Sequence, residues 1–271
     1  MKKLTQIEFY YPKERESLKD KKQLADLIVG EMKEKESLAY SGYLDEESLK
    51  KAIVEYLGDA DINQYKKLSE EQEKKIKTKI EKIVFDSNKI LSVPIKNYIL
   101  IFPYLPTEKD KDFGGVMGVA PYSCVIHLYI SPDNWSSESL SNTITHELNH
   151  TIFYYNHFDN FANYSLIETI LMEGLAENFR EKVLDNKKPA PWSIALNKEK
   201  AFKELESLKL LLISKDKNLH KDVLFGNEKY KKWTGYSVGY WLVKDFIDKR
   251  PDLSWNQIIK LDSSEFLKIV K

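Results

Sequence analysis

The pentapeptide His146-Glu-Leu-Asn-His150 constrains this chain more than any other part of its sequence. On an α-helix its two histidines lie one turn apart on the same face, where their imidazoles can bind one metal ion. Glu147 then stands beside the first ligand, in the position of a general base for a metal-bound water. A chain with five histidines in 271 residues gives roughly 0.01 such matches by chance. The alternative is a polar helix face that carries two solvated histidines.

The residues around the pentapeptide predict the helix that it needs. Four aliphatic side chains recur at helical spacing and form one apolar stripe: Leu140, Ile144, Leu148 and Ile152. The two histidines and Glu147 fall on another side of this helix, which we expect to face a cleft. Ser136 or Ser137 is available as the N-cap. The pattern predicts a helix with a core on one side and chemistry on the other.

A catalytic zinc site usually takes three protein ligands and leaves a fourth position for water. His157 follows His150 by seven residues, without the glycine and the six-residue step of a common three-histidine pattern. Glu168 is expected to close a capping box at the start of the next helix. Glu173 follows His150 after 22 residues, which suits a carboxylate from a neighbouring helix. Gly174 costs about 1 kcal/mol relative to alanine inside a helix, which a close helix approach would explain, so Glu173 is the expected third ligand.

Glu177 lies one helical turn after Glu173 and points the same way. A carboxylate there could accept the second ring N–H of a ligating histidine, which would fix the tautomer and raise the basicity of the ring. An ordinary exposed helix glutamate would fit the sequence equally well. Both interpretations stay open.

The composition excludes several classes of function. With 42 basic and 42 acidic residues, the formal net charge is zero, so no overall field attracts nucleic acid or acidic membranes. Only Arg15, Arg180 and Arg250 are arginines, whereas phosphate recognition favours arginine forks. With no basic stripe, no nucleic-acid partner is expected. The single cysteine, Cys124, excludes an intramolecular disulfide framework and is expected to be a buried strand residue.

The sequence predicts no membrane attachment through a spanning helix. No stretch approaches 18 uninterrupted apolar residues. The first residues lack the apolar segment of a secretory signal. The cytoplasm is therefore the expected location.

Helical periodicity and turn signals predict an α+β fold with few strands among many helices. The helices expected before the pentapeptide cover residues 17–35, 45–57 and 69–91. Two buried strands are expected at 97–103 and 122–131, with a turn and a short edge strand at 114–119. The helices expected after the pentapeptide cover 165–183, 198–214, 234–249 and a short stretch after 263. The pattern changes at Pro94, which predicts an N-terminal helical region over 1–95 and a second domain over 96–271.

Two motifs carry a resemblance to a known family. His146-Glu-Leu-Asn-His150, followed by Glu173-Gly-Leu-Ala-Glu177, is similar to the motif pair of the gluzincin metallopeptidases. The chain resembles more closely the YjaZ-like predicted zinc-dependent proteases of bacteria, a family known as a domain of unknown function. The segment Gly235-Tyr-Ser-Val-Gly-Tyr240 is similar to a stretch near the C-terminus of that family. The resemblance extends from about residue 97 to the end of the chain.

The resemblance implies a gluzincin-like fold, mostly helical, with a small sheet beside the helix of the pentapeptide. It implies that His146, His150 and Glu173 bind Zn²⁺. Glu147 would be the general base and later the proton donor to the leaving amine. The domain over 96–271 would then be the metallopeptidase domain.

The resemblance also implies roles around the metal. A tyrosine or histidine would donate to the oxyanion, with Tyr236 as the first candidate and Tyr240 as the second, although either could be a packing residue. His220 could serve, but nothing supports it. A strand near 114–119 would pair with extended substrate, unless it is a plain loop. Glu177 departs from thermolysin-like enzymes, which have aspartate at this position, and this leaves its role open.

The predicted function is that of a zinc-dependent metallopeptidase, which hydrolyses peptide bonds of a peptide or protein substrate with a zinc-activated water and Glu147 as general base. The main alternative is a zinc-bearing protein that binds peptides or partners without cleaving them. A hydrolase of a non-peptide bond is a further alternative, because the pentapeptide specifies the metal chemistry and not the substrate.

Overall fold

The computed structural model describes eight stretches of the 271-residue chain: 5–10, 20–34, 45–56, 66–92, 96–103, 114–157, 163–186 and 188–270. The contacts divide the chain into two compact units. The first comprises Met1–Asp86 and Val93–Glu147, and the second comprises Ser87–Ser92 and Leu148–Lys271.

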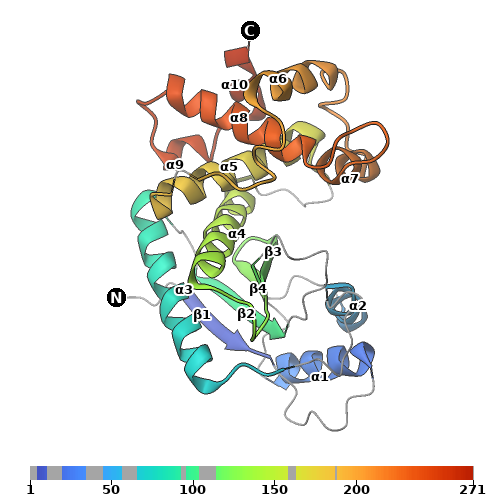
Figure 1. Cartoon of the computed structure of the whole chain (residues 1–271), viewed down its shortest axis with the longest axis vertical. Coiled ribbons are helices and arrows are strands. Elements are labelled where there is room, and N and C mark those ends of the chain that lie inside the picture. The colour runs from blue at the N-terminus through green and yellow to red at the C-terminus, as the bar shows by residue number, and fades with distance from the viewer. Residues whose placement is uncertain are drawn as a thin grey trace. The chain divides into compact units, whose positions relative to one another are not determined.

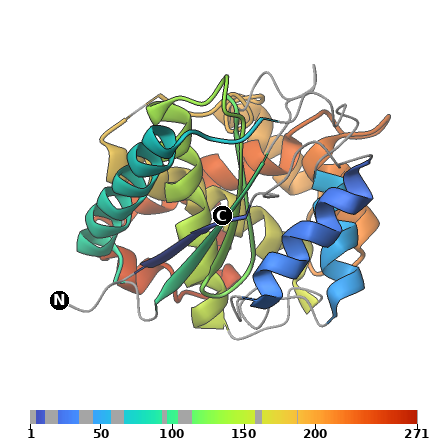
Figure 2. The same cartoon turned by 90° about the horizontal axis from the view of Figure 1, so that it is seen from below.

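The first unit contains a four-stranded sheet with the order β1-β2-β4-β3 (Figures 1 and 2). The strands are β1 (Thr5–Phe9), β2 (Asn97–Pro103), β3 (Val116–Tyr122) and β4 (Val125–Ile130). Both β1 and β4 run parallel to β2, whereas β3 pairs antiparallel with β4. The domain boundary expected at residue 95 stays a prediction. β1 precedes this boundary in the chain and pairs with β2, which follows it.

The strand β4 lies between β2 and β3, and all six of its residues are buried. A strand buried on both faces appears in sequence as a nearly continuous apolar run. This is why its sequence, Val-Ile-His-Leu-Tyr-Ile, predicted a strand. His127 is the exception in the run, and its ring packs edge-on against Phe102 with 5.2 Å between the ring centroids.

A tight turn divides the strand that was expected over 122–131. β3 ends at Tyr122 and β4 begins at Val125. The turn residue Cys124 has a φ of 67°, and its carbonyl accepts a hydrogen bond of 2.7 Å from the backbone N–H of Tyr98. The expectation that Cys124 is a buried strand residue was wrong, because the apolar run continues through a two-residue hairpin loop.

The N-terminal helices form where the periodicity of the sequence places them. They are α1 (Lys21–Glu34), α2 (Glu46–Tyr56) and α3 (Glu70–Ile90). α1 and α2 lie side by side in both views (Figures 1 and 2), and Lys50 Nζ lies 2.9 Å from a carboxylate oxygen of Asp26. Residues 17–19, 35 and 57 of the expected helices lie outside the described part of the chain.

The second unit is built around α5 (Leu166–Leu184), whose residues from Leu166 to Arg180 are buried apart from Glu168. A helix at a protein surface normally keeps one polar face in solvent. α5 instead buries polar and charged side chains. Its neighbours in this unit are α6 (Lys198–Ser207), α7 (Lys217–Phe225), α8 (Thr234–Lys249), α9 (Trp255–Ile258) and α10 (Ser263–Leu267).

The segment after α6 forms turns where a longer helix was expected. The helix predicted over 198–214 ends at Ser207, so that prediction was too long. The carbonyl of Ser214 accepts a hydrogen bond of 2.8 Å from the first backbone N–H of α5, at Leu166. The carbonyl of Leu212 accepts one of 3.0 Å from Ile167. The segment therefore satisfies two N–H groups that a helix start leaves without intrahelical partners.

The predicted α+β class is confirmed, with many helices and a small mixed sheet. The sheet lies beside the helix of the pentapeptide, α4 (Ser137–His157). Gly118 of β3 is in close contact with the side chain of Glu147 in this helix. Within the described stretches, no helix is both long enough and apolar enough to cross a membrane.

Candidate metal centre

The pentapeptide lies in α4, as the sequence predicted. Ser136 caps this helix, since its hydroxyl accepts a hydrogen bond of 2.9 Å from the backbone N–H of Ser139. All four residues of the apolar stripe are buried. The helix begins in the first unit and ends in the second, because the division falls between Glu147 and Leu148.

The helix brings together three side chains that can bind a metal ion. One potential ligand atom from each of His146, Glu147 and His150 lies within 4.8 Å of the other two. His146 is half-buried, whereas Glu147 and His150 are buried. Among the described residues this is the single group of three or more such side chains. The i, i+4 spacing therefore produces a compact donor set on one helix face.

Glu173 of α5 approaches the second histidine. Its Oε2 atom lies 3.6 Å from Nε2 of His150, and both side chains are buried. This distance exceeds that of a good hydrogen bond. In tetrahedral zinc sites with ligand distances of about 2.0–2.2 Å, two ligand atoms lie roughly 3.4 Å apart. The nitrogen and oxygen donors of this pair therefore suit zinc in both chemistry and separation.

The glycine after Glu173 is explained by a close helix crossing. A Cβ atom on Gly174 would lie 2.2 Å from the carbonyl oxygen of Gly239 in α8. A Cβ atom on Gly239 would lie 2.1 Å from the carbonyl oxygen of Ile170. Neither position can hold a side chain without separating the helices. The close approach that Gly174 predicted is thus confirmed, and it occurs directly beside Glu173.

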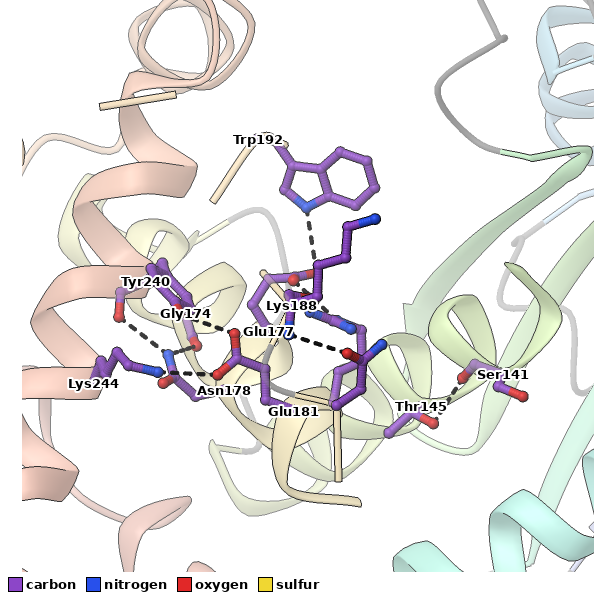
Figure 3. A network of polar contacts seen from close by, with 12 residues as sticks. Ser141, Thr145, Gly174, Glu177, Asn178, Glu181, Lys188, Trp192, Tyr240 and Lys244 are labelled. Atoms are coloured by element: carbon purple, nitrogen blue, oxygen red, sulfur yellow. Dashed lines mark hydrogen bonds and ion pairs between the residues drawn. The ribbon is translucent and has the colours of Figure 1, made fainter. Parts of the chain in front are cut away.

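Glu177 has partners that the sequence did not predict. Its carboxylate accepts a hydrogen bond of 3.1 Å from Nε of Arg180. It accepts another of 3.2 Å from the indole N–H of Trp192 (Figure 3). It is 1% exposed, which excludes the alternative of an ordinary exposed glutamate. A hydrogen bond from the ring N–H of a ligating histidine to the carboxylate of Glu177 stays a prediction. The i, i+3 spacing of Glu177 and Arg180 could have suggested their pairing, but nothing in the sequence indicated Trp192.

The two candidate oxyanion donors lie in α8. The hydroxyl of Tyr240 donates a hydrogen bond of 2.9 Å to Glu181, and Lys244 binds the other oxygen of that carboxylate at 3.0 Å (Figure 3). Burial raises the pKa of Tyr240. The ring of Tyr236 is half-buried and lies edge-on to Phe225, with 6.2 Å between centroids. Tyr240 thus has partners within its own unit, and Tyr236 and Tyr240 stay the first and second candidates.

Three residues that were weighed as alternatives have structural contacts. His157 ends α4, and its Nε2 lies 2.9 Å from the carbonyl oxygen of Ile259. Glu168 closes the expected capping box by accepting a hydrogen bond of 2.8 Å from the backbone N–H of Ser165. His220 is buried, with its Nε2 2.8 Å from the carbonyl oxygen of Ser214.

Comparisons with known proteins agree with the motif pair. The chain is 23% identical over 166 residues to "Uncharacterized protein YjfC" of Bacillus subtilis (strain 168), which covers 57% of this chain and 53% of that protein. It is 29% identical over 138 residues to "Uncharacterized protein YjaZ" of the same organism, which covers 50% of this chain and 52% of that protein. The matches thus span about half the length of these relatives. No solved structure matches the chain.

A family model matches most of the chain. The matched residues, 70–268, include the pentapeptide, Glu173-Gly-Leu-Ala-Glu177 and the segment of α8. The printed description of this family is "Predicted Zn-dependent protease (DUF2268)". The resemblance noted in the sequence is confirmed, and the chain belongs to this family.

Proposed function

We propose that this protein is a zinc-dependent metallopeptidase that hydrolyses peptide bonds. The observation that carries the proposal is the donor set on α4, where His146, Glu147 and His150 come within 4.8 Å of one another. The family description supports the metal and the reaction class. We infer that His146, His150 and Glu173 are the protein ligands, since two imidazoles and a carboxylate form a common catalytic zinc site.

Glu147 is the proposed general base. It is buried and belongs to the same helix face as the two histidines. A bound Zn²⁺ would supply Lewis-acid chemistry, lowering the pKa of a water from about 16 toward 7 and polarising the scissile carbonyl. Glu147 would then accept the proton of the water and pass it to the leaving amine. Tyr236, or Tyr240 as second candidate, would donate a hydrogen bond to the developing oxyanion.

The strand β3 supports a peptide as the substrate. Among the described strands it is the last in the sheet order, and it pairs with β4 on one side. An extended peptide can add to such an edge through main-chain hydrogen bonds. Gly118 brings this strand directly against Glu147. A substrate strand on β3 would therefore place its peptide bonds close to the proposed base.

The decisive experiment compares Glu147→Gln with the wild type in zinc content and in cleavage of a quenched fluorescent peptide library. The amide keeps the shape of the carboxyl group but cannot accept the proton. We expect about one zinc per chain in both proteins and a loss of turnover of at least about 10²-fold in the variant. Glu138→Gln is the matched control, because Glu138 is an exposed residue in the first turn of the same helix.

Each outcome has a clear meaning. Unchanged turnover in Glu147→Gln would contradict the proposed base. Zinc without Glu147-dependent cleavage would favour a zinc-bearing protein that binds peptides or partners. Glu147-dependent hydrolysis of small esters or amides alone would favour a non-peptide substrate.

A further inference from the structure

Gly118 lies at the point where β3 meets the helix of the pentapeptide. A Cβ atom on Gly118 would lie 2.6 Å from Cγ of Glu147 and 2.6 Å from Cγ2 of Thr143. It would also lie 3.1 Å from Cδ, the carboxyl carbon of Glu147. Carbon atoms in favourable contact lie about 3.5–4.0 Å apart. The side chain of Glu147 therefore fills the space that any larger residue at position 118 would need.

Backbone conformation does not explain this glycine. The described glycines with positive φ are Gly114, Gly115 and Gly226. Gly118 lies inside β3 in a conformation that alanine can adopt. A glycine inside a strand weakens it, because it has no side chain to pack and loses more entropy on folding. What Gly118 provides is space in front of Glu147.

Thr143 restricts how a larger residue could be accommodated. Thr143 and Glu147 lie one turn apart on the same face of α4, and the hydroxyl of Thr143 lies 3.4 Å from the carbonyl oxygen of Val116. A β-branched side chain in a helix is stiff about χ1. A methyl group on Gly118 would therefore either rotate the Glu147 side chain or push β3 away from α4. Both changes move the carboxylate relative to the backbone of β3.

We propose that Gly118 is a positioning residue for Glu147, which keeps the carboxylate of the general base at a defined place beside the edge strand. The catalytic part of this inference rests on the proposed function, because Gly118 acts through the proposed base. The steric part concerns Gly118, Thr143 and Glu147 alone. The two parts can therefore be tested separately.

The steric part is tested by urea denaturation of a mutant cycle. Gly118→Ala should lower the urea midpoint of the wild type, because the new methyl group collides with two side chains. In a Thr143→Ser, Glu147→Ala background both colliding carbons are absent, while the hydroxyl near Val116 is kept. There Gly118→Ala should raise the midpoint, because alanine is better than glycine inside a strand. If Gly118→Ala does not fold in the wild-type background, recovery of folding in the Thr143→Ser, Glu147→Ala background gives the same answer.

The catalytic part is tested by zinc content and steady-state kinetics of Gly118→Ala in otherwise wild-type protein. A displacement of a catalytic group by about 1 Å costs roughly 10²-fold in rate, so we expect kcat to fall by about this factor. Zinc per chain should be unchanged, and KM should change by less than about twofold, since ground-state binding is retained. Gly30→Ala is the control for the substitution itself, because a Cβ on Gly30 meets nothing within 4 Å.

Two results would overturn the inference. The first is a change in urea midpoint that has the same size and sign in both backgrounds. The second is a Gly118→Ala protein with full kcat while Glu147→Gln is inactive. If the wild type shows no Glu147-dependent hydrolysis, the proposed function fails, and the mutant cycle still decides whether Gly118 sets the place of Glu147.

Discussion

His127 is a base buried in the centre of a sheet. It lies on β4 between two neighbouring strands and is 1% exposed. Burial lowers its pKa from 6.5 to about 3. A charged imidazole would lose its hydration there, so the folded chain keeps the ring neutral at any pH near neutrality. Folding is thereby linked to the protonation of this residue.

The sign of the linkage follows from the lowered pKa. Below pH 6.5 the unfolded chain binds a proton at His127 that the folded chain does not bind, so stability falls as the pH falls from 6.5 toward 3. At 1.36 kcal/mol per pKa unit, lowering the pH from 7.5 to 5 removes about 2 kcal/mol. The free energy of unfolding, measured by urea denaturation across this pH range, should change less steeply with pH in His127→Gln than in the wild type. Equal slopes in the two proteins would contradict a neutral buried His127.

Residues related by local spacing were predictable, and the helix approach at Gly174 could be inferred from a glycine inside a helix. Most other tertiary contacts were not predictable. The positions of His146 and His150 could be inferred because their i, i+4 relation depends only on the helix that carries them. The indole of Trp192 reaches Glu177 from a segment with no helical or strand periodicity. No pattern in the sequence records such a contact, and the same is true of Gly118 against Glu147.

At the scale of elements, the crossing of α5 and α8 depends on two glycines. The backbone of each helix occupies the space that a side chain of the other would need, at Gly174 and Gly239. Such contact brings Cα–H groups near carbonyl oxygens and buries backbone directly against backbone. The crossing is adjacent to Glu173, so the packing of α8 determines where this proposed ligand lies within its unit.

Gly239→Ala should destabilise the protein, because its Cβ would lie 2.1 Å from the carbonyl oxygen of Ile170. The expected loss is about 1–3 kcal/mol or more, as for other overpacked interiors. Gly30→Ala should instead stabilise α1 by about 0.5–1 kcal/mol, since its Cβ meets open space. Urea midpoints of the two variants measure both effects. Urea midpoints that shift in the same direction in the two variants would contradict tight packing where α5 and α8 cross.

Periodicity predicted most of the elements, but β1, α7 and α9 were not predicted, and the ends of several predicted elements were wrong. The three N-terminal helices and β2 were found from their apolar spacing. The β3–β4 turn was missed because apolar residues continue on both sides of Cys124. The helix expected from residue 198 was predicted too long, because Leu208 and Leu212 are buried in turns at positions that also fit helical spacing. Buried apolar residues can therefore have the same spacing in a series of turns as in a helix.

At the scale of the whole molecule, metal binding and stability should be linked. The proposed ligands come from two helices, so zinc would bind the folded chain far better than the unfolded chain. A ligand at 100 times its dissociation constant stabilises the folded state by about 2.7 kcal/mol.

Removing zinc with a chelator should lower the melting temperature of the wild type by about 5–10 °C, from the expected 2–4 °C per kcal/mol for a chain of this size. Differential scanning calorimetry with and without chelator measures the shift. The control is Glu173→Ala, which should hold little zinc and melt at the same temperature in both conditions. A wild-type protein that releases zinc without any change in melting would contradict the proposed ligand set.

The segment from Lys188 to Leu196 has no helix or strand, yet its main chain is tied to two helices. Arg180 binds the carbonyl of Lys188, Ser237 bridges the carbonyl of Trp192 and the N–H of Leu196, and Trp241 binds the carbonyl of Leu196. Proteases cut chains that can detach and straighten, and irregular stretches are usually their first targets. For any peptidase, the loops of its own chain are potential substrates that are present at high local concentration. Anchored in this way, the segment would resist the proposed peptidase activity of its own chain without any regular secondary structure.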